Sequence, residues 1–226
     1  PIQYILKTTS FYGLESICTP SALIPRPETE ELVDWIIKSE TNEITILDIG
    51  TGTGCISVSL ANHNGFVLDA LDISSSALEL AKQNAKKNKV NINFIEADIL
   101  EYKSDKKYDL IVSNPPYVRN LEKKKMQNNV LHFEPELALF VEDDDPLFFY
   151  SAILKFAHNN LIDKGKIYFE INEYLYNDIK GLLIFFGYVN IELKKDSFGK
   201  FRFVKAAKYA NCLLYTSPSP RDVEES

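Results

Sequence analysis

Short apolar runs alternate with stretches of helical period along most of the chain, and this alternation limits the fold more than any other feature. Runs rich in Ile, Val and Phe occupy residues 43–50, 66–74, 91–99, 108–114 and 166–172. Helical patterns lie at 55–63, 74–87, 146–161 and 174–186. Alternation of this kind predicts parallel βαβ units, with helices covering both faces of one sheet.

The last two apolar runs, 188–196 and 200–208, are separated by so few residues that only a hairpin can join them. Strands joined by a hairpin are antiparallel, so we expect a seven-stranded, mostly parallel sheet with a reversed C-terminal strand at its edge. This α/β arrangement is similar to the Rossmann-like sheet of class I methyltransferases rather than to that of dehydrogenases. In the 74–87 helix, Ser76 and Glu79 have the spacing of a capping box.

We expect three parts in the chain. Residues 1–40 are predicted to form a short β element and a helix that begins near Pro27, a favoured first-turn residue. Residues 41–208 form the core domain. Residues 209–226 are predicted to be a disordered tail, and their sequence resembles translated vector or adapter sequence. Because the chain begins at Pro1 rather than at Met, we expect an upstream segment to be absent.

Composition and charge argue against several classes of protein. The 226 residues carry a net charge of −7 without a long basic block, which disfavours binding dominated by nucleic-acid phosphates. The three cysteines lack metal or disulfide spacing, which favours a reducing compartment, and no apolar run is long enough to span a membrane. We therefore expect a cytoplasmic protein. His63, His132 and His158 have no common ligand spacing, so no metal site is expected.

A glycine-rich turn follows the first core strand and is the first candidate for ligand binding. It consists of Gly50, Thr51, Gly52, Thr53 and Gly54. A turn of this kind between a strand and a helix lets a ligand approach the backbone closely. Asp72 ends the next strand, where a carboxylate can accept the ribose hydroxyls of an adenosine cofactor. A tight turn without a ligand, and a helix-capping role for Asp72 before Ser74, remain open alternatives.

The third strand is followed by Asp98 and Ile99. Asp98 can accept a hydrogen bond from the adenine amine, and Ile99 can pack on the ring, although a solvated loop acid would have the same sequence. Strand ends that carry glycine and acidic residues suit a cofactor with a positive sulfonium and no phosphate. The predicted cofactor is therefore S-adenosylmethionine.

The fourth strand ends at Asn114 and continues into Pro115, Pro116 and Tyr117. The two prolines cannot extend a strand, and they hold the neighbouring carbonyls in fixed directions. A planar NH2 group is a poor nucleophile because its lone pair is delocalised. Asn114 Oδ1 and the Pro115 carbonyl can accept its two hydrogens while Tyr117 forms an aromatic wall, so that positioning and electrostatics catalyse the reaction. We predict Asn114, Pro115 and Tyr117 as catalytic residues, all four residues as the substrate-binding corner, and Asn114 as a further contact of the cofactor.

Several stretches resemble the peptide chain release factor glutamine methyltransferases of the HemK or PrmC type. They are the Asn-Pro-Pro-Tyr corner, PIQYIL (1–6), FYGL (11–14), LIPRPETEELV (23–33) and FEPELALF (133–140). The resemblance covers about residues 1–208, and its most specific piece runs from Arg26 to Glu30. It implies that the glutamine of the Gly-Gly-Gln tip of a class 1 release factor is the methyl acceptor and that this factor is the protein partner.

The chain departs from the pattern of that family in two places. The resemblance implies an N-terminal helical domain that helps to grip the release factor, which we expect to be absent here, and we expect the segment from Tyr209 to have no counterpart in the family. Two other functions remain as alternatives: an adenine-N6 DNA or RNA methyltransferase, which would need a basic groove, and a non-catalytic cofactor-binding module. Arg26 and Glu28 suit either the substrate entrance or a structural salt bridge and helix start, and Glu134-Pro135 suits a simple turn.

Overall fold

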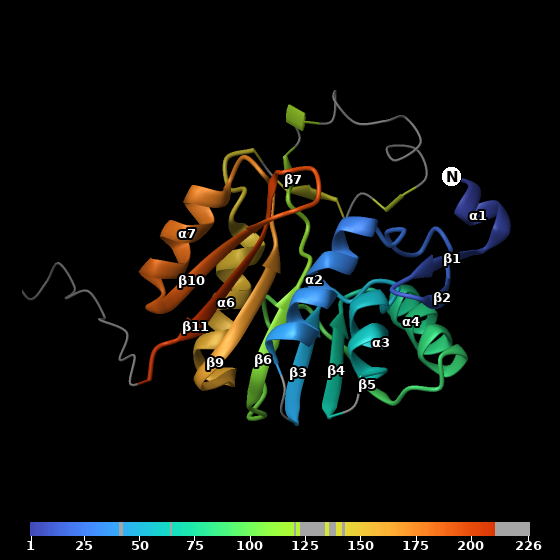
Figure 1. Ribbon diagram of the computed structural model, residues 1–226, viewed down its shortest axis with the longest axis horizontal. Helices are drawn as coiled ribbons and strands as arrows, with labels where there is room; N and C mark the ends of the chain where they lie inside the picture. Colours follow the sequence, from blue (N-terminus) through green and yellow to red (C-terminus); the bar gives the residue numbers. More distant parts are fainter. Residues whose placement is uncertain are drawn as a thin grey trace, which may run out of the picture.

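The computed structural model describes residues 1–40, 43–63, 65–119, 121–122, 134–135, 139–141 and 143–210. One seven-stranded sheet runs through its centre, in the order β10-β11-β9-β6-β3-β4-β5 (Figure 1). Its strands are β3 (Ile44–Ile49), β4 (Phe66–Asp72), β5 (Ile92–Glu96), β6 (Tyr108–Ser113), β9 (Leu161–Glu170), β10 (Tyr188–Lys195) and β11 (Phe201–Lys208). The predicted α/β class and the mostly parallel seven-stranded sheet are confirmed.

The C-terminal hairpin contains the reversed strand, but this strand does not lie at the edge of the sheet. β11 runs antiparallel to both β9 and β10, and β10 forms the edge. The predicted edge position was therefore wrong. The crossover through α7 (Tyr176–Phe185) places β10 two positions away from β9, and β11 returns between them. In this position β11 satisfies backbone hydrogen bonds on both of its sides.

Two layers of helices cover the two faces of the sheet. α2 (Pro27–Ser39) and α3 (Cys55–Ala61) pack on one face, where Ile46 of β3 is fully buried. α6 (Phe148–Asn160) and α7 pack on the other, where Leu47 is fully buried. Side chains of successive strand residues point to opposite faces, so one strand serves both cores.

α4 (Ser75–Lys87) begins with a cap that differs from the expected one. The Ser74 side chain accepts a hydrogen bond of 3.2 Å from the backbone N–H of Ala77. Ser76 lies inside the helix, and Glu79 pairs with Lys82. The predicted capping box was wrong, because Ser74 has the extended backbone that an N-cap residue requires.

The segment before the sheet forms α1 (Ile2–Leu6) and a hairpin of β1 (Thr8–Phe11) and β2 (Leu14–Ile17). The buried side chain of Asn84 in α4 accepts the N–H of Ile17 at 2.6 Å and donates to the carbonyl of Thr53 at 2.9 Å. One side chain thus ties the hairpin to the glycine-rich turn. A further short parallel pair consists of β7 (Val118–Arg119) and β8 (Phe140–Val141).

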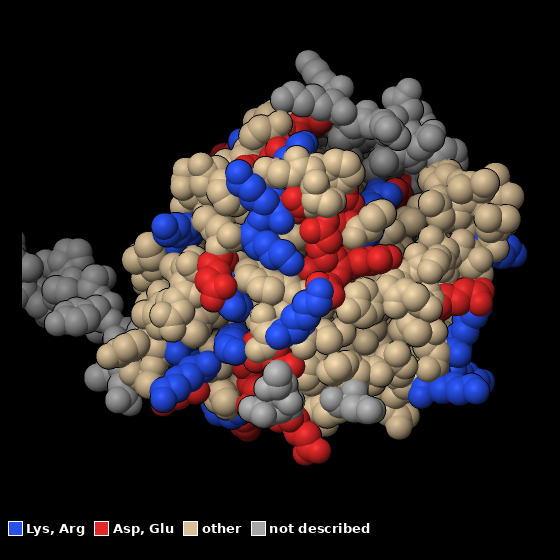
Figure 2. Space-filling view, viewed as in Figure 1, with Lys and Arg blue, Asp and Glu red and all other residues tan. Residues whose placement is uncertain are grey.

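Within the described part of the chain, no helix has both the length and the apolar character needed to cross a bilayer. On the face shown in Figure 2, basic and acidic side chains are interspersed, and acidic side chains gather over α2. The predicted tail lies outside the described residues from position 211 onward, as do His132 and most of the 133–140 stretch.

Candidate active site

Four parallel strands end side by side at the carboxyl edge of the sheet, which is at the top of the sheet in Figure 1. Ile49 of β3 pairs with Leu71 of β4 on one side and with Ser113 of β6 on the other. Asp72 of β4 pairs with Glu96 of β5. This register brings together the segments that follow the four strands, which contain the predicted site residues Gly50 to Gly54, Asp72, Asp98, Ile99 and Asn114.

The glycine-rich turn has the open backbone that a ligand needs. Gly50, Gly52 and Gly54 all have positive φ, at 71°, 56° and 78°. A methyl group added at Gly50 would meet nothing within 4 Å, and one at Gly52 would meet only Ala22, at 3.8 Å. At Gly54 it would lie 3.0 Å from Cβ of Ala81, so this glycine is required for the close packing of α3 on α4. The first two glycines instead leave space beside the backbone.

Asp72 connects the end of β4 to this turn. Its Oδ2 accepts the N–H of Gly52 at 2.8 Å, and its Oδ1 accepts the N–H of Ser74 at 2.9 Å. Burial raises the pKa of Asp72 above its usual value. Each carboxylate oxygen has a second lone pair, so these contacts leave acceptor capacity for ribose hydroxyls. Asp72 thus binds the backbone of Ser74, the N-cap residue of α4, and this contact is compatible with the predicted binding of the cofactor.

Asp48 lies under the turn, and the sequence did not identify it as a site residue although it opens the motif. Thr51 Oγ1 donates to Asp48 Oδ2 at 2.6 Å, while Asp48 Oδ1 has no hydrogen-bond partner among the described residues. Asp48 is fully buried, and burial raises its pKa from 3.8 to about 6. Thr51 and Thr53 are buried, whereas Gly50 is exposed and Gly52 is half-buried, so the two glycines are the part of the turn that a ligand can reach.

Asp98 and Ile99 lie in the turn after β5. Asp98 Oδ1 accepts the N–H of Leu100 at 2.9 Å, and its carbonyl accepts the N–H of Tyr102 at 2.8 Å. These bonds shape the turn and leave the second carboxylate oxygen as an acceptor. Ile99 is half-buried and packs against the core on the α6 side of the sheet.

The Asn-Pro-Pro-Tyr corner is held mainly by side chains, since its two prolines have no N–H to donate. Asn114 Nδ2 donates to Thr29 Oγ1 over 3.5 Å. The hydroxyl of Tyr117 donates to Glu170 Oε1 at 2.9 Å, and Asn172 Nδ2 donates to the Tyr117 carbonyl at 3.1 Å. Burial raises the pKa of Tyr117 well above its usual value, and the Glu170 carboxylate raises it further, so this side chain stays a neutral phenol.

Thr29 and Glu170 also contact the corner, and neither was predicted as a site residue, although Thr29 lies within the stretch from Arg26 to Glu30. Thr29 Oγ1 donates to Glu170 Oε2 at 2.7 Å, and each residue is only 2% exposed. Burial raises the pKa of Glu170, while the bonds from Thr29 and Tyr117 and the charge of Arg202 lower it. One signal was present in the sequence: Glu170 ends an apolar strand, where a buried carboxylate needs partners.

Arg26 and Glu134 form a salt bridge at the edge of the site. Arg26 Nη2 lies 2.7 Å from Glu134 Oε1, and the Glu134 side chain is 1% exposed. Glu134 Oε2 also accepts the N–H of Ile24 at 3.3 Å. The salt-bridge alternative for Arg26 is confirmed. Glu134 is more than a turn residue, because its buried carboxylate holds the segment before α2.

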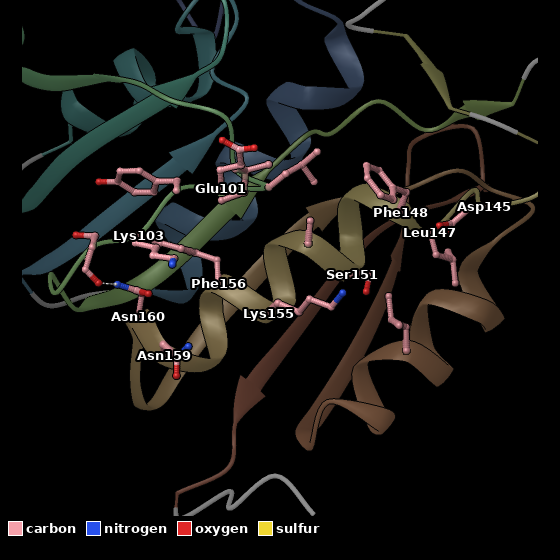
Figure 3. A pocket seen from close by; sticks show the side chains of 16 residues that line it. Glu101, Lys103, Asp145, Leu147, Phe148, Ser151, Lys155, Phe156, Asn159 and Asn160 are labelled. Atoms are coloured by element: carbon pink, nitrogen blue, oxygen red, sulfur yellow. Dashed lines mark hydrogen bonds between the residues drawn. The ribbon is translucent and has the colours of Figure 1, made fainter. Parts of the chain in front are cut away.

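A hollow of about 690 Å³ lies along α6 (Figure 3). It runs between this helix and the segment 99–104, and the Asn160 side chain joins the two by donating to the Ser104 carbonyl at 2.6 Å. Of the predicted site residues, Ile99 lines it. The corner and the glycine-rich turn are not part of its wall.

The polar groups at the strand ends fit an adenosyl sulfonium cofactor. Asp72 and Asp98 are carboxylates, which attract a positively charged sulfonium and repel a phosphate, and the residues from Gly50 to Gly54 carry no cationic side chain. Open space beside Gly50 and Gly52 gives a ligand access to the backbone. The acceptor Oδ1 of Asp48, without a partner among the described residues, adds negative potential beneath the turn.

Comparisons with known proteins agree with this geometry. Residues 29–134 match the model of the methyltransferase small domain family. The chain is 52% identical to the release factor glutamine methyltransferase of Flavobacterium psychrophilum, over 91% of this chain and 74% of that protein. It is 44% identical to the protein of the same name from Bacteroides thetaiotaomicron, over 91% and 75%. The crystal structure of a methyltransferase from Pyrococcus furiosus aligns with a TM-score of 0.66 at 21% identity, over 92% of this chain and 94% of that one.

The sheet order, the glycine-rich turn and these matches define a class I methyltransferase that uses S-adenosylmethionine as its cofactor. The predicted fold class and cofactor are thereby confirmed. Within this class, the identity and coverage of the relatives place the chain plainly: it belongs to the family of release factor glutamine methyltransferases.

Proposed function

We propose that the protein transfers a methyl group from S-adenosylmethionine to the side-chain amide nitrogen of the glutamine in the Gly-Gly-Gln motif of class 1 release factors. The observation that carries this proposal is the position of the corner. Ser113, immediately before it, donates to the Ile49 carbonyl at 2.7 Å, so Asn114 begins directly beside the glycine-rich turn. The names of the relatives supply the substrate class.

In this proposal the residues at the strand ends would hold the cofactor. The backbone of Gly50 to Gly54 would face it, Asp72 would accept the ribose hydroxyls, Asp98 would accept the adenine amine, and Ile99 would pack on the ring. When bound, S-adenosylmethionine supplies a methyl group on a positively charged sulfonium. The carboxylates of Asp72 and Asp98 favour this charge at the site.

The corner positions the acceptor. Asn114 Oδ1 and the Pro115 carbonyl each accept one hydrogen of the glutamine amide, and this pair of bonds fixes the plane and direction of the nitrogen. Pro115 and Pro116 keep the geometry rigid because their φ angles are fixed. The Tyr117 ring, held by Glu170, forms the wall for the planar group. Rate enhancement then comes from orientation and from preorganised acceptors rather than from a strong base.

We also propose the division into residues 1–40 as an appendage and 41–208 as the catalytic domain. The hairpin of the appendage contacts the glycine-rich turn through Asn84, and α2 supplies Thr29 to the corner. The appendage therefore completes the site rather than merely preceding it. Since release factors act in translation, we place the protein in the cytoplasm.

A transfer assay with methyl-labelled cofactor tests the proposal. The acceptors are an intact release factor, a Gly-Gly-Gln peptide, the same peptide with Glu in place of Gln, and adenine-containing DNA. We expect label on the release factor and the Gln peptide alone. Label on DNA but not on release factor would replace the substrate assignment with an adenine-N6 enzyme, and binding of cofactor without any transfer would support a non-catalytic module.

The variant Asn114→Ala should retain most of its cofactor binding and lose transfer by about 100-fold or more, since it removes one of the two acceptors. Asn91→Ala, at an exposed position after α4, is the matched control and should transfer at the wild-type rate.

A further inference from the structure

The buried pair of Thr29 and Glu170 joins the corner from two other elements of the fold. Thr29 lies in the first turn of α2, and Glu170 is the last residue of β9. Neither residue is part of the Asn-Pro-Pro-Tyr motif. Both are buried, so water does not satisfy their polar side chains. Yet one contacts Asn114 and the other contacts Tyr117, the two ends of the corner.

The direction of the hydrogen bonds along this chain of groups follows from counting protons. A threonine hydroxyl has one hydrogen, and an ionised carboxylate can only accept. At 2.7 Å the hydrogen of Thr29 is directed to Glu170 Oε2. The side of Thr29 Oγ1 that faces Asn114 therefore presents a lone pair, and only the NH2 group of Asn114 can bind it.

This polarity decides which way the Asn114 amide is turned. Its Nδ2 faces Thr29 at 3.5 Å, so Oδ1 lies on the opposite edge of the amide, away from Thr29. An oxygen in that position is the group that a substrate NH2 requires. With the amide reversed, an NH2 group would oppose the NH2 group of the substrate, and neither could accept.

We propose that Glu170, acting through the Thr29 hydroxyl, is a positioning residue that sets the Asn114 amide with its oxygen toward the substrate amide. The same carboxylate receives the Tyr117 hydroxyl, so one buried acid orients both the acceptor and the aromatic wall. This inference rests on the proposed function and adds two positioning residues to it, neither of which touches the reacting atoms.

Each oxygen of the Glu170 carboxylate accepts one hydroxyl hydrogen, from Thr29 and from Tyr117, as an ionised acceptor does. Burial raises the pKa of Glu170 above its usual value and Glu28 on α2 adds to this, while the two hydroxyls and the charge of Arg202 on β11 oppose the rise. Tyr150 on α6 donates its hydroxyl to the Glu170 backbone carbonyl at 3.0 Å and so contacts the residue without competing for the carboxylate. Protonation of Glu170 would give the carboxyl group a hydrogen to donate. The Thr29 hydroxyl could then accept from Glu170 and would no longer have to direct its own hydrogen toward it.

The test compares Thr29→Val, which is nearly isosteric but has no hydroxyl, with Thr29→Ser, which keeps it. The measurements are kcat and KM for a Gly-Gly-Gln peptide, the dissociation constant of the cofactor, and Tm. For Thr29→Val we expect kcat to fall by about 10- to 100-fold, the scale of a misplaced catalytic group, with a smaller change in KM and unchanged cofactor affinity. Thr29→Ser should stay within about threefold of wild type.

Thr45→Val is the matched control. Thr45 Oγ1 also donates to a carboxylate oxygen, that of Asp109, at the same distance of 2.7 Å, but it lies near the amino end of β3. A merely structural effect would lower Tm in both Val variants and would leave kcat of the folded fraction unchanged in both. The inference requires the loss of kcat in Thr29→Val alone.

Glu170→Gln provides a second, independent measurement. It places an NH2 group against Thr29 or Tyr117, so kcat should fall. We expect wild-type kcat to decline toward acidic pH as Glu170 takes up a proton, and we expect no such decline in the variant. Wild-type turnover in Thr29→Val at equal cofactor affinity would overturn the inference while leaving the proposed function intact. Failure of the wild-type protein to methylate the peptide or the release factor would instead refute the proposed function.

Discussion

The buried carboxylate of Asp48 makes the stability of the protein depend on pH, and one substitution tests this. Burial raises the pKa of Asp48 from 3.8 to about 6, so the folded state binds its proton more tightly than the unfolded state does. The contribution of Asp48 to the free energy of unfolding is therefore highest below pH 3.8, falls as the pH rises through the interval to about 6, and is constant above it. A shift of about two pKa units corresponds to a loss of about 3 kcal/mol.

Asp48→Asn removes this titration. Between pH 4.5 and pH 8, the free energy of unfolding of the variant relative to wild type should rise by about 2 kcal/mol, since most of the transition falls in that interval. Urea unfolding at the two pH values, without cofactor, measures this difference. Any fixed cost of placing an amide at the site is the same at both values and cancels.

The exposed substitution Asp105→Asn serves as the control and should show no such change. A change below about 0.5 kcal/mol for Asp48→Asn, or one of opposite sign, would refute the reasoning from burial.

Two further predictions concern stability. Gly54→Ala should lower the free energy of unfolding by about 2–4 kcal/mol, because its φ is 78° and its new methyl group would lie 3.0 Å from the β-carbon of Ala81 in α4. Gly181→Ala in α7, where nothing lies within 4 Å, is the control and should be neutral or stabilising in the same urea titration. Arg26→Met should lower the free energy of unfolding by roughly 1–3 kcal/mol, because it leaves the buried Glu134 carboxylate without its cation. Lys38→Met breaks an exposed pair and should change the free energy of unfolding far less, so equal losses for the two cations would contradict the role of burial.

Much of the fold could be predicted because its signals are local. The apolar run 43–50 and the glycines after it lie within a dozen residues of one another, and the strand and turn that they form were predicted within a residue or two. The same is true of the strand that ends before Asn114. Parallel strands then bring these local features to one edge, so the candidate site followed from the fold class.

The remaining contacts depend on residues far apart in the sequence. Thr29 and Glu170 are separated by 141 positions, and Arg26 and Glu134 by 108. No periodicity or spacing links such pairs, because they meet only when α2 packs beside the strand ends. The position of β11 between two other strands has the same origin. A hairpin determines that β10 and β11 pair with each other, but it does not determine which of the two pairs with β9.

Tandem mass spectrometry of a release factor, after incubation with the cofactor and the protein, tests the central claim most directly. The account predicts one added methyl group on the side-chain nitrogen of the glutamine in the Gly-Gly-Gln motif, formed about 100-fold or more slowly when Asn114→Ala replaces wild type. A methyl group on another residue, or an unchanged yield of the methylated glutamine with the variant, would contradict the account.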